Sequence, residues 1–150
     1  PYGKLYNWYT VDDSRNVCPT GWHVPTDGEW NTLIGYLDPL FDPNPILTQS
    51  TTAGGKMKSM DTGFYGWYTP NQGATNESGF SGLPGGEYFV NSNLNTDGFI
   101  STKESGYFWS STEAITAGEV WIRHLYFDHG YVYRFDVNKK YGISVRCLKD

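Results

Sequence analysis

The stretch from residue 93 to residue 104 has oxygen-bearing side chains at the spacing of a calcium-binding loop. It reads NLNTDGFISTKE and fits the template D-x-[DN]-x-[DN]-G-x5-E, except that Asn93 replaces the first Asp. Calcium takes several oxygen ligands, and the glycine permits the sharp bend of such a loop. The candidate ligands are Asn93, Asn95, Asp97 and Glu104, so calcium is the candidate cofactor, although the chain shows no requirement for one. The same residue types also suit a plain hairpin turn.

Aromatic residues surround the glycine-rich middle of the chain, where exposed rings could stack on sugar rings. The candidate ligand-binding residues are five rings and two polar partners, namely Trp67, Tyr68, Tyr88, Tyr107, Trp109, Glu113 and Arg123. Trp67 and Tyr68, which lie between Gly66 and Pro70, are the rings that we most expect to be exposed. Four tryptophans are expected to pack in the core in place of missing aliphatic residues: Trp22, Trp30, Trp109 and Trp121.

No local signature of a catalytic nucleophile is found in the sequence. His23, His124 and His129 could act as bases, and Ser110 and Ser111 supply hydroxyl groups. The chain has no G-x-S-x-G segment, which is the local sign of an exposed nucleophilic serine. We therefore expect that the protein is not an enzyme.

The two cysteines, Cys18 and Cys147, lie near opposite ends of the 150-residue chain. One widely separated pair cannot supply the four ligands of a structural zinc site, so the alternatives are a disulfide or two buried thiols. If the ends of the chain lie side by side, a disulfide would close almost the whole chain, a loop worth roughly 4.7–5 kcal/mol in the chain-entropy model. A disulfide would favour an oxidising compartment outside the cytoplasm.

Composition and charge argue against several classes of protein. The net charge is −5, and Lys139-Lys140 is the longest run of basic residues, so binding to nucleic acid or to anionic lipid is not expected. No apolar run approaches the ~18–20 residues that span a bilayer. Aromatic residues make up 17% and charged residues 18% of the chain, which is unlike a disordered sequence. The length predicts one domain over residues 1–150, and the start at Pro1 predicts a piece of a processed protein.

The clearest helix signal begins at Thr26. Thr26 and Glu29 have the spacing of a capping box, and Pro25 precedes them at a position where a helix tolerates proline. Apolar residues then follow at helical spacing up to Pro39, which ends the pattern: Trp30, Leu33, Ile34 and Leu37. A second short helix is expected around residues 46–60.

Strand patterns dominate the two ends of the chain. Residues 5–11, LYNWYTV, predict an opening strand. Four strand-like runs in the last third predict an antiparallel meander, and they cover residues 107–111, 119–127, 131–137 and 143–149. Residues 61–106 between them are glycine-rich and predict long loops, where binding sites usually lie. The sequence thus predicts an α+β fold, with one or two helices and a small antiparallel sheet.

Four long motifs carry a family resemblance: CPTGWHVPTDGEW (18–30), GATNESGFSGLPGG (73–86), GYFWSSTE (106–113) and GISVRCLKD (142–150). In this order and near these spacings they resemble the Fibrobacter succinogenes major paralogous domain, and the match covers nearly the whole chain. More distantly, the chain is similar to C-type-lectin-like and formylglycine-generating-enzyme-like domains. The resemblance implies a C-type-lectin-like fold, a bacterial protein that is secreted or held at the cell surface, and an end-to-end cysteine pair.

The sequence departs from the sugar-binding C-type lectins at their calcium motifs. Glu-Pro-Asn and Trp-Asn-Asp are replaced here by Thr69-Pro70-Asn71 and Trp109-Ser110-Ser111. We therefore do not carry that calcium–sugar geometry over to this chain.

Three functions follow as expectations. The first is a non-catalytic extracellular module that presents a loop surface to a carbohydrate or a cell-surface protein. The second is a self-assembling subunit of a bacterial surface layer or filament, because low charge and many Tyr, Trp and Gly residues suit contacts between copies. The third is an enzyme of the formylglycine-generating kind.

Overall fold

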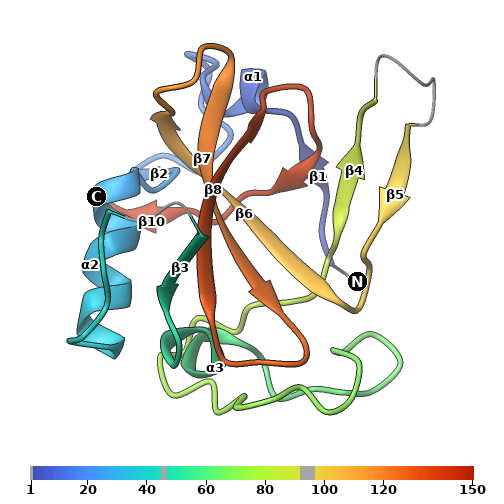
Figure 1. The fold of residues 1–150 in the computed structure, drawn as a ribbon. Helices are drawn as coiled ribbons and strands as arrows, with labels where there is room; N and C mark the ends of the chain where they lie inside the picture. The colour runs from blue at the N-terminus through green and yellow to red at the C-terminus, as the bar shows by residue number, and fades with distance from the viewer. Residues whose placement is uncertain (1, 45–46, 92–96) are drawn as a thin grey trace.

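The centre of the fold is a six-stranded sheet with the strand order β1-β9-β6-β7-β8-β3 (Figure 1). The computed structural model describes residues 2–44, 47–91 and 97–150. The strands of this sheet are β1 (Leu5–Tyr6), β3 (Leu47–Ser50), β6 (Ser105–Glu113), β7 (Glu119–Tyr126), β8 (Val132–Asn138) and β9 (Ile143–Ser144). Two small sheets pair β10 (Leu148–Lys149) with β2 (Trp22–His23) and β4 (Glu87–Phe89) with β5 (Gly98–Ile100). The helices are α1 (Trp8–Val11), α2 (Asp27–Leu37) and α3 (Ala53–Met57).

The predicted α+β class and the antiparallel meander are confirmed. β6, β7 and β8 pair antiparallel in succession, while β9 pairs parallel with β6. The opening strand is shorter than predicted, because the chain turns into α1 after Tyr6. Asn7 starts that helix, since its side-chain oxygen accepts a hydrogen bond of 3.2 Å from the Thr10 N–H. The last predicted run is likewise divided, into β9 and β10.

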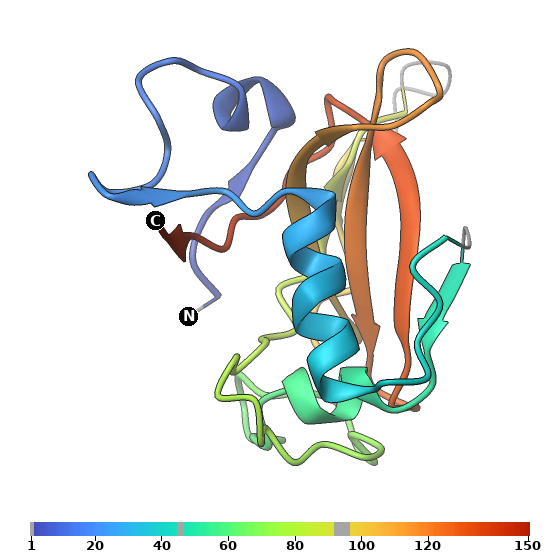
Figure 2. The ribbon, with the colours of Figure 1, turned by 90° about the vertical axis from the view of Figure 1, so that its left-hand side faces the viewer.

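Helix α2 forms as its capping box predicts. The Thr26 side chain accepts from the Glu29 N–H, and the Glu29 carboxylate accepts from the Thr26 N–H. The helix lies against one face of the central sheet, as Figure 2 shows. Its buried residues join side chains from β6, β7, β8 and α3 in one core cluster, made of Trp30, Ile34, Leu37, Ala53, Met57, Trp67, Phe108, Leu125 and Val132. Between residues 46 and 60 the expected helix covers only α3, and β3 precedes it.

A buried cluster of one carboxylate and two guanidinium groups joins α2 to the sheet. Asp27, the first residue of the helix, bonds Arg123 of β7 at 2.8 Å and Arg134 of β8 at 2.8 and 2.9 Å. The two arginines face each other across the strands, and their exposed fractions are 0% and 8%. Burial raises the pKa of Asp27, but the bonds from Arg134 and the charge of Arg123 outweigh it and hold the pKa below its usual value. The start of the helix is therefore tied to two neighbouring strands.

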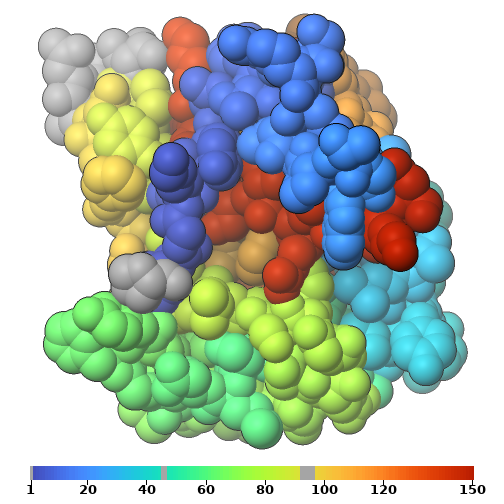
Figure 3. All heavy atoms as spheres, turned by 180° about the vertical axis from the view of Figure 1, so that it is seen from behind, coloured from blue at the N-terminus to red at the C-terminus, as the bar shows by residue number. Residues whose placement is uncertain are grey.

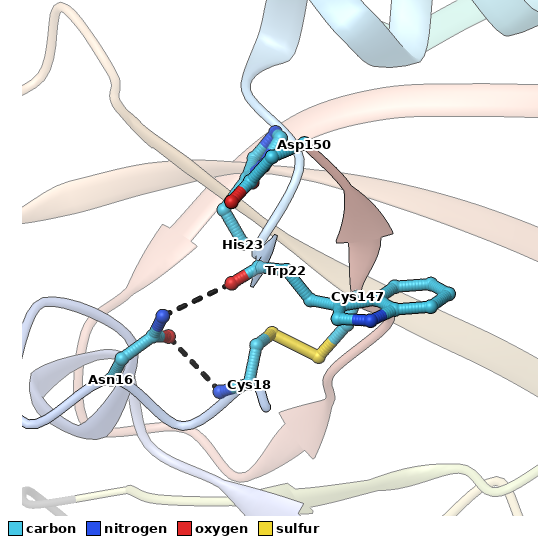
Figure 4. Close-up of a disulfide and its surroundings, with 6 residues drawn as sticks. All are labelled: Asn16, Cys18, Trp22, His23, Cys147 and Asp150. Carbon is cyan, nitrogen blue, oxygen red and sulfur yellow. Dashed lines mark hydrogen bonds and ion pairs between the residues drawn. A yellow bond between two sulfur atoms is a disulfide. The ribbon is translucent and has the colours of Figure 1, made fainter. Parts of the chain in front are cut away.

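The second core cluster brings segments from both ends of the chain together. Trp8, Cys18 and Val24 pack against residues of β6, β7 and β9, including Trp109 and Ile143. Cys18 and Cys147 form a disulfide with a Cα–Cα distance of 5.8 Å, drawn in Figure 4. This confirms the disulfide alternative that the sequence left open.

Polar contacts around the disulfide extend this attachment. The Asn16 amide accepts from the Cys18 N–H at 3.0 Å and donates to the Trp22 carbonyl at 3.0 Å (Figure 4). The His23 ring lies between two carboxylates, with Nδ1 at 2.6 Å from Asp150 and Nε2 at 2.9 Å from Glu29. The hydrogen bonds to Asp150 and then to Glu29 raise the pKa of His23. His23 thus links Asp150, the last residue, to the start of α2, and its two contacts favour the protonated ring.

Trp22 differs from its predicted role in the core. Its side chain is 39% exposed. The reason is that β2 belongs to the small β2–β10 sheet rather than to the central one, and the Trp22 indole extends past Cys147 in Figure 4. The other three tryptophans expected in the core, Trp30, Trp109 and Trp121, are buried.

Replacing Asp27 tests the buried attachment of α2. Asp27→Asn removes the counter-charge of two arginines that lie away from water, so it should lower the free energy of unfolding by about 3–5 kcal/mol. Glu77→Gln is the matched control, because Glu77 is half exposed in its ion pair with Lys56, and it should cost about 0–1 kcal/mol. Urea unfolding followed by fluorescence measures both. Equal effects of the two substitutions would contradict a stabilising role for the buried group.

The His23 contacts predict a pH-dependent contribution to stability. A raised pKa means that folding favours the protonated ring, so the contribution is complete below the unfolded pKa of 6.5 and is lost as pH rises through the higher folded pKa. His23→Gln keeps a polar side chain without the charge. The difference in urea midpoint between wild type and His23→Gln should therefore shrink between pH 6 and pH 9. A difference that stays constant over this range would argue against a charged His23.

Candidate ligand-binding site

A recess of about 470 Å³ opens where α3, a loop and the β7–β8 turn meet. These elements gather at the lower end of the molecule in Figure 1. Three short segments supply its lining, and the residues are Thr51, Thr52, Lys56, Gln72, Gly73, Thr75, Glu77, His129, Gly130 and Tyr131. We call it the Tyr131 recess. Its volume lies within the range of about 300–1,000 Å³ that is usual for small-molecule sites.

Lys58 fixes two of the three lining segments in place. Its side chain is fully buried, and its Nζ donates hydrogen bonds of 2.9 Å each to the carbonyls of Gln72, Tyr126 and His129. Three acceptors match the three N–H donors of an ammonium group, which is the condition for burying such a charge. Burial lowers the pKa of Lys58 to about 8. The loop that contains Gln72 and the β7–β8 turn are thereby both hydrogen-bonded to the Nζ atom of Lys58.

Two glycines let α3 approach the other segments directly. A Cβ at Gly54 would overlap the carbonyl of Tyr131, and a Cβ at Gly55 would overlap that of Gly73. The Gly55 N–H donates to the Gly130 carbonyl at 3.2 Å, and the Gly55 carbonyl accepts from the Thr75 N–H at 3.0 Å. The backbone around the recess is therefore close-packed without side chains between its segments.

Stacked rings form one side of the recess. The rings of His129 and Tyr131 lie 4.6 Å apart at an angle of 23°, and Tyr131 is 37% exposed. Burial lowers the pKa of His129 despite the opposing charge of Asp128, so the ring is neutral near pH 7. Its Nδ1 accepts from the Tyr131 N–H, which assigns the proton to Nε2, 3.1 Å from the Tyr133 hydroxyl. These bonds orient the stack.

The rest of the lining of the recess is largely polar. Thr51, Gln72 and Thr75 are exposed there, and the Lys56 ammonium pairs with Glu77 at 3.1 Å. Hydroxyl and amide groups both donate and accept hydrogen bonds. An exposed aromatic face in the same recess as such groups can hold a ligand that has one apolar face and several hydroxyl groups.

Three of the predicted ligand-binding residues are buried, and for Trp67 this corrects the expectation that its ring is exposed. Trp67, Trp109 and Arg123 are each 0% exposed. The Trp67 Nε1 donates to the Gly82 carbonyl at 3.0 Å, because its loop folds back and places the ring in the core. Trp109 likewise donates to the Tyr6 carbonyl at 2.7 Å. Arg123 is held by Asp27, so all three serve the fold.

The other four predicted residues lie on three parts of the chain, a loop, β4 and β6. Tyr68 is 45% exposed on the loop after Trp67. Tyr88 of β4 meets Phe99 at a ring distance of 5.0 Å. In β6, Tyr107 stacks on His124 at 4.4 Å, whereas Glu113 at the far end pairs with Lys139 at 2.9 Å. Their use in binding stays a prediction.

The sequence interpretation missed the residues of the Tyr131 recess. The available signal was the turn Asp128-His129-Gly130, after which Tyr131 follows at the tip of a predicted hairpin. A ring at a hairpin tip has fewer neighbours to bury it than a ring within a strand. The loop residues that line the same recess gave no comparable signal, because their proximity to the β7–β8 turn depends on the bonds of Lys58.

The calcium-loop prediction falls partly on residues that the structure does not describe. Asn93 and Asn95 lie outside the described residues. Asp97 directly precedes β5 and Glu104 directly precedes β6, and the Asp97 carboxylate accepts from the Asn91 N–H at 2.9 Å. The antiparallel β4–β5 pair agrees with the hairpin alternative. Over the described ranges, no three His, Cys, Asp or Glu side chains are grouped to hold a metal ion, and the calcium site stays a prediction.

Ser105 and His124 form a hydrogen-bonded serine–histidine pair within the sheet. Ser105 Oγ lies 3.0 Å from His124 Nε2, but Ser105 is only 1% exposed. Burial lowers the pKa of His124 to about 3, far from the neutral range in which a general base works best. Tyr107 also covers this ring. The pair therefore acts as a packed, hydrogen-bonded part of the sheet in this structure.

Comparison with known proteins identifies the family. Residues 1–149 match the Fibrobacter succinogenes major domain (Fib_succ_major), in agreement with the resemblance of the four motifs. No curated protein and no solved structure matches the chain. Within the described ranges, no helix has the length and apolar character needed to cross a bilayer. The match spans nearly the whole chain, and the protein therefore belongs to the Fibrobacter succinogenes major domain family.

Proposed function

We propose that this domain is a non-catalytic module that binds carbohydrate in the Tyr131 recess. The observation that carries the proposal is the exposed Tyr131 ring, stacked on His129 in a recess that polar side chains also line. A pyranose ring has apolar C–H faces and a rim of hydroxyl groups. The first matches the tyrosine face, and the second matches the hydroxyl and amide groups of Thr51, Gln72 and Thr75.

The rigidity of the recess supports binding of a weakly held ligand such as a sugar. Ordering loops and side chains on association costs affinity, so a preformed site retains more of its contact energy. Lys58 holds the backbone at Gln72 and His129, and the contact of Gly55 with Gly130 holds α3. Ligand contact with Tyr131 therefore needs little rearrangement.

An exported location and a C-type-lectin-like fold belong to the same proposal. The Cys18–Cys147 disulfide is typical of oxidising compartments. The capped helix α2, the meander and the pairing of β2 with β10 are compatible with a C-type-lectin-like arrangement, with the long loops left for binding. We do not propose the formylglycine-generating kind of enzyme, because both cysteines are joined in the disulfide.

Self-assembly is the second candidate function, and one observation favours it. β5 pairs with β4 in a two-stranded sheet, and Phe99 and Ile100 of β5 are 75% and 43% exposed. An exposed apolar strand at a sheet edge can pair with another chain.

Tyr131→Ala tests the sugar proposal. The wild-type protein should bind members of a broad glycan array, and calorimetry on the strongest binder should show an affinity loss of about tenfold or more for Tyr131→Ala, since a buried aromatic anchor costs more than about 1 kcal/mol when truncated. Thr75→Val should cost a smaller amount, about 0.5–1.5 kcal/mol. Tyr36→Ala is the matched control, because Tyr36 is an 84% exposed tyrosine on α2, and it should bind as the wild type does.

Removal of calcium with EDTA should leave this binding unchanged, because the one carboxylate that lines the recess, Glu77, is paired with Lys56. The proposal would be refuted if the wild-type protein bound no glycan on the array, or if folded Tyr131→Ala bound with unchanged affinity. Self-assembly would be favoured instead if the array showed no binding and light scattering gave a molar mass that rises with protein concentration.

A further inference from the structure

A second hollow, of about 310 Å³, lies between the start of α2, residues 78–80 and the C-terminal segment. In Figure 3 the red C-terminal residues lie above the yellow-green loop and the cyan helix. Its lining is largely apolar and comprises Pro25, Glu29, Trp30, Leu33, Ser78, Gly79, Phe80, Arg146, Cys147 and Leu148. None of these residues lines the Tyr131 recess. We call this hollow the Arg146 cleft, and its analysis does not rest on the proposed sugar site.

Arg146 brings a positive charge to this apolar lining. Its guanidinium carbon lies 4.3 Å from the centre of the Phe80 ring, and its Nη2 donates to the Phe80 carbonyl. The side chain is half-buried. Burial lowers the pKa of Arg146, and no acid offsets that effect. The cation is therefore desolvated on one side without a charge to compensate it.

The other described arginines differ from Arg146 in this respect. Arg15, Arg123 and Arg134 each form an ion pair with an aspartate at 2.6–2.8 Å. Within the described ranges, Arg146 has no carboxylate at ion-pair distance. A guanidinium has five N–H donors in a planar fork that matches a carboxylate, and most of the donors of Arg146 remain for another partner.

Glu29 lines the same cleft but does not neutralise Arg146. One carboxylate oxygen of Glu29 accepts from the Thr26 N–H at 2.8 Å and from the Thr26 hydroxyl at 2.9 Å. The other oxygen lies 2.9 Å from His23 Nε2. Those bonds hold the carboxylate at the start of α2, away from ion-pair contact with Arg146.

The apolar side of the cleft is rigid. The Phe80 ring meets Trp30 at 5.6 Å and Phe108 at 5.2 Å, both close to edge-on. Trp30 is fixed in turn by its Nε1, which donates to the Trp109 carbonyl at 3.2 Å. A ligand would therefore meet a preformed apolar surface with one cation at its edge.

We propose that the Arg146 cleft binds a small organic acid with an apolar body and a single carboxylate. The body lies against Phe80, Trp30 and Leu33, and the carboxylate pairs with the guanidinium of Arg146. The volume, at the lower end of the usual range for small-molecule sites, limits the ligand to a compact acid. An ion pair at the edge of an apolar surface is stronger than the same pair in water, because the effective dielectric constant is lower there.

The test compares 3-phenylpropanoate with its neutral amide, 3-phenylpropanamide, by NMR titration of the intact domain. The acid should bind about tenfold more tightly than the amide or better, and it should shift signals of Leu33, Phe80 and Leu148. Arg146→Gln should abolish the preference for the acid. Lys140→Gln, which removes one exposed positive charge outside the cleft, should preserve it.

Equal affinities for acid and amide in the wild type would overturn the proposal, and so would the absence of binding at millimolar acid. Shifts confined to residues outside the cleft would also overturn it. If Arg146→Gln fails to fold, Arg146→Lys keeps the charge but loses the planar fork, and it should show a reduced preference for the acid. Neither probe is a sugar, so these results stand apart from those of the glycan array.

Discussion

The buried ammonium of Lys58 is the interaction on which the loop-rich end of this domain depends. Three carbonyls, from Gln72, Tyr126 and His129, converge on its Nζ. A buried charge without such partners costs several kcal/mol, so the loop and the β7–β8 turn are stable together around it rather than separately. The Tyr131 recess is the space that this arrangement leaves at the surface.

Polar attachments also organise the rest of a chain that has few aliphatic residues. Asp27 joins the first turn of α2 to β7 and β8 through two arginines, and the disulfide and His23 join the C-terminal strand to residues near the N-terminus. Large rings fill the two cores between these attachments. Arg146 departs from this pattern, because its charge lies at a cleft and not beside an aspartate. This difference is the reason for proposing it as a binding group.

The sequence predicts those parts of the fold whose signals are local. The capping box at Thr26 and the alternating strands of the meander depend on neighbouring residues, and both are confirmed. The burial of Lys58, Trp67 and Arg123 depends on partners far along the chain, such as Tyr126 for Lys58. For this reason the sequence led to the wrong expectation that Trp67 is exposed. The recess was missed for the same reason, since Thr75 and Tyr131 meet only in the folded chain.

The most direct test of this account is the titration of Lys58, followed through its ε-carbon by NMR with the Lys58→Met variant for assignment. Removal of the ammonium from water predicts a midpoint near pH 8. Lys58→Met should also speed amide exchange at Gln72, whose N–H is held at 2.8 Å by the Phe127 carbonyl. A midpoint near the ordinary value of 10.5, with amide exchange at Gln72 unchanged in the variant, would contradict the account.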